Sequence, residues 1–137
     1  MRLSTAARYG LKAMSDLCVK SAGSKIPVSV SEIASRQNIP VNYLEQLLGK
    51  LKRSGLLQSV RGAQGGYLLA RSPDEISVAD ILNALGEPVI FGSCQTDKGC
   101  ENAVTCPTFN LWRRVKESVD EILRNTKLND IAAEKNS

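Results

Sequence analysis

The sequence predicts a mainly α-helical fold with a small β-hairpin wing: a winged helix-turn-helix followed by a long C-terminal helix. Apolar residues recur at helical spacing in several separate segments. Two of these segments are joined by a short turn, as in a helix-turn-helix. Two short apolar runs with a Gly-rich connection follow directly, which is typical of a hairpin.

The size and composition suit one compact protein of 137 residues with a real core. No long apolar run is present, so we expect neither a signal peptide nor a membrane span, and a cytoplasmic location without a membrane partner. That compartment is reducing, which favours free thiolates over disulfides.

The first helix is expected over residues 4–20, because its apolar residues follow i, i+3, i+4 spacing. These residues are Ala7, Leu11, Met14, Leu17 and Cys18. Cys18 lies on this stripe, so we interpret it as a small core residue.

The second helix is predicted from Val30 to Gln37 and should bury its apolar residues Val30, Ile33 and Ala34. Ser29 and Glu32 have the spacing of a capping box, in which each side chain bonds the other residue's backbone N–H. Asn38 suits a left-handed position after the helix, and Pro40 suits the start of the next one.

The third helix ends at Ser54-Gly55 and should bury Leu44, Leu47, Leu48 and Leu51. Its other side carries amide, phenol and cationic groups that can meet base edges and phosphates. These residues are Asn42, Tyr43, Gln46, Lys50 and Arg53. An ordinary helical hairpin is the simpler interpretation, and this polar face favours DNA binding over it.

A hairpin is predicted next, from the runs Leu56–Val60 and Tyr67–Ala70 around the connection 61–66. A hairpin directly after the second helix of a helix-turn-helix is a wing. Arg61 at its base can enter a minor groove, where A·T-rich DNA concentrates negative potential. A phosphate-binding loop is the alternative, but no strand–loop–helix context or Lys/Ser pair supports it.

Two further helices complete the expected order. Ser77 and Asp80 begin a capped helix that buries Val78, Ile81, Leu82 and Leu85 and ends at Gly86. A long helix from about Thr108 to Arg124 then carries the apolar stripe Leu111, Val115, Val119 and Ile122. This stripe suggests pairing with a second chain, and Thr126 is expected to cap a final turn.

Charge is divided unevenly along the chain. Residues 1–72 hold 11 Lys and Arg against 3 Asp and Glu, whereas residues 73–137 hold 7 against 11. A polyanion would bind the basic half, because each neutralised phosphate releases counterions. Nucleic acid is therefore the expected partner.

Three cysteines, Cys94, Cys100 and Cys106, repeat every six residues in a Gly- and Pro-punctuated stretch. This spacing fits no helical face, and thiolates in a loop suit a metal or cluster. Structural zinc is an alternative, although such sites usually have four Cys or His ligands in close pairs. A redox-active thiol pair is a third interpretation.

The order of these features resembles the IscR-type iron–sulfur cluster regulators. The matching stretches are Arg2-Leu3-Ser4, Arg8-Tyr9, Tyr43 to Leu47, Ser59 to Gly62, Gly65 to Leu69, the three cysteines and Leu111-Trp112-Arg113. Sister branches include nitric-oxide- or redox-sensing repressors and cysteine-metabolism repressors. In the nitric-oxide-sensing branch an aspartate occupies the position that is Arg8 here, which argues against that branch.

The resemblance implies a homodimer that binds a double-stranded DNA operator. We expect a repressor of iron–sulfur cluster biogenesis genes, or a dual regulator. The resemblance also implies a 2Fe–2S cluster on Cys94, Cys100 and Cys106, and iron–sulfur assembly proteins as further partners. The IscR type has a histidine three residues after the last cysteine. Here that residue is Phe109, and the chain contains no histidine. The fourth ligand stays open between Asp97, Glu101, Cys18, another group of the chain and a partner residue.

We therefore expect three regions: a DNA-binding domain over 1–86, a cluster-binding loop over 87–107, and a dimerisation helix and tail over 108–137. Asn42, Tyr43, Gln46 and Arg61 are expected on bases or in grooves, and Arg2, Lys50 and Arg53 on phosphates. The resemblance implies that Glu45 rejects one class of site, whereas a solvated carboxylate on the helix flank is the simpler interpretation. Gly62 belongs to the same matching stretch as Arg61. No nucleophile–base pair or cofactor loop is present, so we expect no enzyme.

Overall fold

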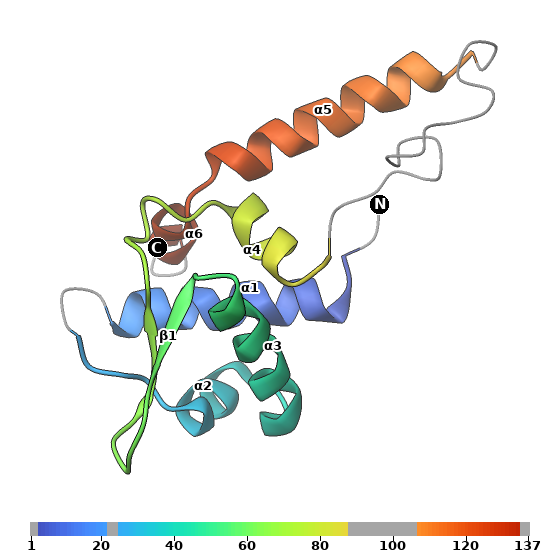
Figure 1. The fold of residues 1–137 in the computed structure, drawn as a ribbon. Coiled ribbons are helices and arrows are strands. Elements are labelled where there is room, and N and C mark those ends of the chain that lie inside the picture. The colour runs from blue at the N-terminus through green and yellow to red at the C-terminus, as the bar shows by residue number, and fades with distance from the viewer. Residues whose placement is uncertain (1–2, 22–24, 88–106, 135–137) are drawn as a thin grey trace.

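The computed structural model describes residues 3–21, 25–87 and 107–134. It confirms the predicted fold class: helices with one two-stranded antiparallel hairpin (Figure 1). The elements are α1 (Thr5–Lys20), α2 (Val30–Gln37), α3 (Val41–Arg53), β1 (Leu57–Val60), β2 (Gly66–Leu69), α4 (Val78–Ala84), α5 (Phe109–Asn125) and α6 (Leu128–Glu134).

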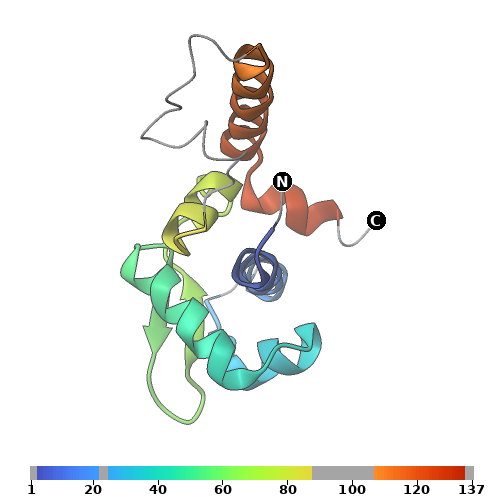
Figure 2. The same ribbon diagram turned by 90° about the vertical axis from the view of Figure 1, so that its right-hand side faces the viewer.

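Helix α1 lies at the centre of the molecule. Viewed end-on in Figure 2, it has α2 and α3 on one side and α4 and α6 on the other. Ser4 caps it by accepting from the N–H of Ala7, and Met14 and Leu17 are fully buried. Gly10 allows α4 to approach closely, since a Cβ there would lie 2.3 Å from Cδ1 of Leu85. Cys18 is buried, as expected of a core residue.

Helices α2 and α3 form the helix-turn-helix. Asn38 adopts the predicted left-handed conformation, with φ 56° and ψ 52°, between the two helices. All four leucines expected in the core from α3 are buried. In α2, Ile33 and Ala34 are buried, whereas Val30 is half-buried against the core.

The capping box expected at the start of α2 is only half formed. The Ser29 hydroxyl accepts from the Glu32 N–H at 3.2 Å, as predicted. The Glu32 carboxylate lies instead against the Arg36 guanidinium at 3.5 Å. A cation one turn along the helix thus attracts this carboxylate away from the helix start.

The hairpin pairs Leu57 with Leu69 and Val60 with Gly66. The first strand begins one residue later than expected and ends at Val60 as expected, whereas the second is shifted by one residue toward the turn. Gly66 enters the strand because its backbone packs on the segment before α2, where a Cβ would lie 2.2 Å from the carbonyl oxygen of Val28. Tyr67 exchanges two backbone hydrogen bonds with Val28, at 2.8 and 3.0 Å. The second strand of the wing, near its turn, is thereby attached to the segment that leads into the helix-turn-helix.

Helix α4 begins and ends as predicted. Ser77 and Asp80 form both bonds of a capping box, each at 3.0 Å. Gly86 follows the helix with φ 71°. Val78, Ile81, Leu82 and Leu85 are all buried, as expected.

Helix α5 extends away from the other elements, and α6 returns to lie against α1 (Figures 1 and 2). Leu128 of α6 is fully buried, so this part of the C-terminal segment belongs to the core. The prediction for Thr126 is wrong. Thr126 ends α5, where its hydroxyl donates to the Ile122 carbonyl at 2.7 Å, and the Asp130 carboxylate accepts from the Lys127 N–H at the start of α6.

Candidate nucleic-acid interface

Helix α3 has a buried apolar side and an exposed polar side. Its leucines pack into the core, so the residues on the other side of the helix must face outward. The exposed polar residues are Asn42, Glu45, Gln46, Lys50 and Arg53. This side therefore presents amide, carboxylate and cationic groups that can bond base edges and phosphates.

Positive charge gathers at the end of α3. Lys50, Lys52 and Arg53 all lie in its last turn. Cations there also interact favourably with the partial negative charge of a helix C-terminus. They form a compact cationic region at one end of the polar face.

Tyr43 differs from the other residues expected at this interface, because it is half-buried and packs against the core. Its ring meets that of Tyr9 from α1 edge to face, with centroids 5.9 Å apart and planes at 81°. Lys12 lies 5.9 Å from the centroid of Tyr9. Tyr43 therefore joins the first turn of α3 to α1, a structural role that its sequence position did not indicate.

Arg61 and Gly62 lie directly after β1 and are both exposed. Gly62 has φ 110°, a conformation that other residues rarely adopt. Gly65 closes the turn by donating from its N–H to the Gly62 carbonyl at 3.0 Å. The turn thus leaves Arg61 exposed at the end of β1, while Val28 pairs with Tyr67 of the neighbouring strand.

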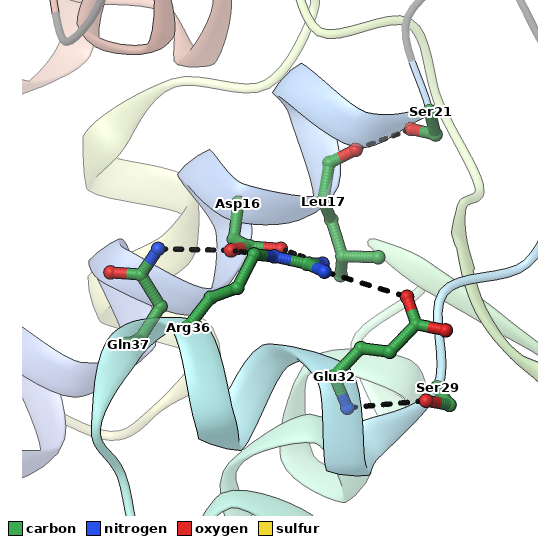
Figure 3. A network of polar contacts seen from close by, with 7 residues as sticks. All are labelled: Asp16, Leu17, Ser21, Ser29, Glu32, Arg36 and Gln37. Atoms are coloured by element: carbon green, nitrogen blue, oxygen red, sulfur yellow. Dashed lines mark hydrogen bonds and ion pairs between the residues drawn. The ribbon is translucent and has the colours of Figure 1, made fainter.

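Asp16 anchors the helix-turn-helix to α1 through three hydrogen bonds. It accepts from Nε of Arg36 at 3.0 Å, from Nη2 of Arg36 at 2.7 Å and from Nε2 of Gln37 at 2.9 Å. The Asp16 side chain is 1% exposed, and that of Arg36 is 33% exposed. Figure 3 shows the guanidinium of Arg36 lying between Asp16 and Glu32. The hydrogen bonds that Arg36 donates to Asp16 raise the pKa of Arg36, so the guanidinium stays charged.

Sequence reasoning missed this cluster. The available signal was an aspartate within the apolar stripe of the first helix, between Met14 and Leu17. A carboxylate in such a place needs a buried partner. Its two partners lie 20 and 21 residues away in the sequence, so helical spacing alone did not identify them.

Two groups of predicted site residues lie outside the described residues. They are Arg2 and the three cysteines Cys94, Cys100 and Cys106. Within 3–21, 25–87 and 107–134, no three His, Cys, Asp or Glu side chains come together as a metal site. Burial raises the pKa of the Cys18 thiol, which favours its uncharged form. No helix among the described residues is long and apolar enough to span a bilayer.

Comparison with known proteins gives matches over nearly the whole chain. The model of the Rrf2 family, described as iron-dependent transcriptional regulators, matches residues 3–134. The chain is 38% identical over 135 residues to the HTH-type transcriptional regulator IscR of Pectobacterium carotovorum, covering 98% of this chain and 81% of that protein.

Two solved structures have a similar fold. CymR, the global cysteine regulator of B. subtilis, gives a TM-score of 0.81 at 38% identity and 98% coverage of both chains. IscR of T. potens gives a TM-score of 0.76 at 39% identity, covering 98% of this chain and 88% of that chain. Sequence and fold thus point to the same group of proteins.

Proposed function

The chain belongs to the Rrf2 family of transcriptional regulators, and on that premise we propose that it is a homodimeric, iron–sulfur-sensing repressor. It is a DNA-binding transcriptional regulator, as its relatives are, and not an enzyme. The observation that carries the DNA-binding role is the exposed polar face of α3 beside a wing that ends in Arg61. A cytoplasmic location belongs to the same proposal.

The DNA interface that we propose uses α3 and the wing together. Asn42, Gln46 and the phenol of Tyr43 contact base edges in the major groove, while Lys50 and Arg53 contact phosphates. Arg61, with Gly62 beside it, enters the adjacent minor groove, and Arg2 adds a phosphate contact. In a two-fold dimer the two copies of α3 bind successive major grooves, about 34–36 Å apart.

The dimer that we propose forms through α5. No residue of this helix is buried, although its apolar stripe includes Leu111 at 50% exposure and Ile122 at 63%. Trp112, at 42%, widens the same side. Water-exposed apolar surface of this kind favours association with a second copy.

The donor set of the chain fits a 2Fe–2S cluster at three positions. Cys94, Cys100 and Cys106 supply soft thiolates, the usual ligands of such clusters. Phe109, at the histidine position of the IscR type, is the first residue of α5 and supplies no ligand. The fourth ligand therefore comes from another group, and an oxygen donor would make the cluster labile. When bound, the cluster supplies a redox- and iron-sensitive group next to the start of α5.

Regulation requires that cluster loading favours one conformation over another. A group that binds two conformations equally well shifts no equilibrium, however tightly it binds. We propose that loading at Cys94, Cys100 and Cys106 biases the placement of α5, and hence the spacing of the two α3 helices. Cluster supply then sets operator affinity, and the genes of iron–sulfur cluster biogenesis are the proposed targets, with their assembly proteins as further partners.

Anaerobic reconstitution with iron and sulfide tests the cluster. We expect a coloured protein whose iron and sulfide content corresponds to one 2Fe–2S cluster per chain, measured by visible absorption and metal analysis. Cys100→Ser should lose the colour. Cys18→Ala is the comparison variant, because it removes a thiol that is buried in the core: it should keep the colour, and a loss of colour would identify Cys18 as the fourth ligand. Wild-type protein that stays colourless after loading, or that holds zinc instead, would refute the cluster.

A cysteine-metabolism repressor controlled by a partner protein is the second candidate function. Two observations favour it: the chain lacks histidine, and its fold matches CymR. In that case metal-free protein would bind its operator at full affinity, and only a protein effector would change that affinity. Gel-shift titrations of metal-free and reconstituted protein separate the two functions.

A further inference from the structure

The turn of the helix-turn-helix is held by a buried carboxylate on another helix. We propose that Asp16 is a positioning residue for DNA recognition: through Arg36 and Gln37 it sets the orientation of α2 and α3 against α1. The inference rests on the proposed function in one respect, that α3 reads DNA.

The contacts of Asp16 converge on one end of α2. Arg36 and Gln37 are the last two residues of this helix, and left-handed Asn38 follows them directly. Both oxygens of the carboxylate are used, since Oδ1 accepts from Nη2 of Arg36 and Oδ2 accepts from its Nε and from Gln37. A two-pronged contact of this kind restrains direction as well as distance.

Stability alone is a poor explanation for this cluster. A buried charge loses its hydration, and this cost largely offsets the attraction between the two charged partners. Apolar residues at the same positions therefore often stabilise a protein equally well. Asp16 lies among buried apolar neighbours on its own helix, with Met14 and Leu17 fully buried. Apolar contacts between α1 and α2 are compatible with several similar orientations of the two helices, whereas the bidentate contact of Asp16 with Arg36 favours a single orientation.

Orientation matters because the interface has two parts that must reach DNA together. The wing is attached through Val28 to the segment before α2, and α3 follows the turn after α2. A rotation of α2 against α1 therefore moves α3 and Arg61 relative to the rest of the chain. Tyr43 against Tyr9 provides a second contact to α1, at the first turn of α3.

A direct role of Arg36 at a phosphate is the competing explanation, because a third of its side chain is exposed. The two explanations predict opposite changes in DNA affinity when the charge of Asp16 is removed. If Arg36 binds phosphate, removing the Asp16 charge frees the guanidinium and strengthens DNA binding, with a steeper dependence on salt. If Asp16 positions α3, the same change weakens binding to the preferred sequence.

The test compares Asp16→Asn with Glu32→Gln. Both substitutions neutralise a carboxylate beside the same guanidinium, but Glu32 is 61% exposed and makes a single contact at 3.5 Å. The probes are a duplex selected by the wild-type protein from a random-sequence pool and an unselected random duplex. Fluorescence anisotropy gives both affinities over a range of salt concentrations, at a temperature where circular dichroism shows each variant folded.

We expect Asp16→Asn to lose about tenfold in affinity for the selected duplex, and to keep its affinity for the random one. Glu32→Gln should match the wild type on both. Arg36→Lys, which keeps the charge but loses the two-pronged contact, should repeat the loss, and the Asp16→Asn/Arg36→Lys double variant should be no weaker than either single one. The ratio of the two affinities is the informative readout, since a loss of folded protein lowers both equally.

Three results would overturn the proposal. Asp16→Asn could bind both duplexes as Glu32→Gln does, or it could bind more tightly, which would identify Arg36 as a phosphate ligand. If neither Asp16→Asn nor Arg36→Lys folds, the pair contributes to the stability of the fold and not specifically to DNA recognition. The failure of the proposed function is distinct, because the wild-type protein would then select no sequence at all.

Discussion

Arg61 is exposed at the end of β1, and it carries the minor-groove part of the proposed interface. Arg61→Ala should weaken binding to the selected duplex by about 1–3 kcal/mol, because the loss removes a cation from a site of concentrated negative potential. Arg71→Ala is a control of equal charge at the other end of the hairpin, where the guanidinium donates to the Glu75 carbonyl. Equal effects of the two substitutions in a binding titration would show that Arg61 contributes only general charge.

Glu45 is an exposed carboxylate on the side of α3 that we assign to DNA. An anion facing phosphates is unfavourable unless it accepts a hydrogen bond from a cytosine amino group. Glu45→Ala should therefore broaden site choice, raising affinity for weak sites more than for strong ones. Relative affinities across a panel of duplexes measure this, and an unchanged ranking would show that Glu45 only faces solvent.

At the scale of single residues, the sequence predicted which side chains are exposed better than it predicted which side chains contact one another. The polar face of α3 follows from the spacing of its leucines, and the burial of all four leucines confirms it. The contacts of Tyr43 with Tyr9 and of Asp16 with Arg36 join different helices. Helical periodicity says which side of a helix is buried, but it does not say which neighbour covers that side.

At the scale of elements, the attachment of the wing to the segment before α2 depends on a close backbone contact at Gly66. Gly66→Ala should destabilise the protein by more than the strain of an unusual backbone conformation alone, which is about 1–3 kcal/mol, because φ of Gly66 is 155° and the added Cβ collides with Val28. Gly62→Ala is the matched control: φ there is 110°, and open space surrounds an added Cβ. Chemical denaturation gives both free energies of unfolding, and equal losses would contradict the role of the Val28 contact.

Helix ends were predictable where a local signal defines them. Asn38, and the capping pair of Ser77 with Asp80, act within a few residues of their own helix, and both were identified from the sequence. The second strand lies one residue from its expected position, because Gly66 pairs with Val60 and packs closely on Val28, a contact between distant segments. Thr126 was misassigned because its hydroxyl can bond either the helix before it or the helix after it.

For the whole molecule, the apolar side of α5 is the feature that we assign to association. Ile122→Asp should convert the dimer to monomers, since it places a charge within the surface that would be buried between two copies. Asn110→Asp, an equal charge change on the opposite side of the same helix, should leave the dimer intact. Sedimentation equilibrium distinguishes these outcomes, and an Ile122→Asp protein that remains dimeric would place the interface elsewhere.

The overall architecture was largely predictable, because segregated charge and ordered helix signals define a winged helix-turn-helix with a long helix after it. The return of α6 onto α1 was not predicted. Leu128 and Ala132 are buried there, but seven residues carry too short an apolar pattern to identify their neighbour. Contacts between distant segments become visible only once the chain is folded.

The joint between α5 and α6 has a mechanical consequence. The Thr126 carbonyl accepts from the Val78 N–H at 2.9 Å, and the Leu128 N–H donates to the Ile76 carbonyl at 2.8 Å. These bonds hold the C-terminal end of α5, a helix about 25 Å long, against the start of α4. In the proposed dimer, a displacement of α5 by the second subunit would therefore carry α4 with it, and α4 packs on both α1 and α3.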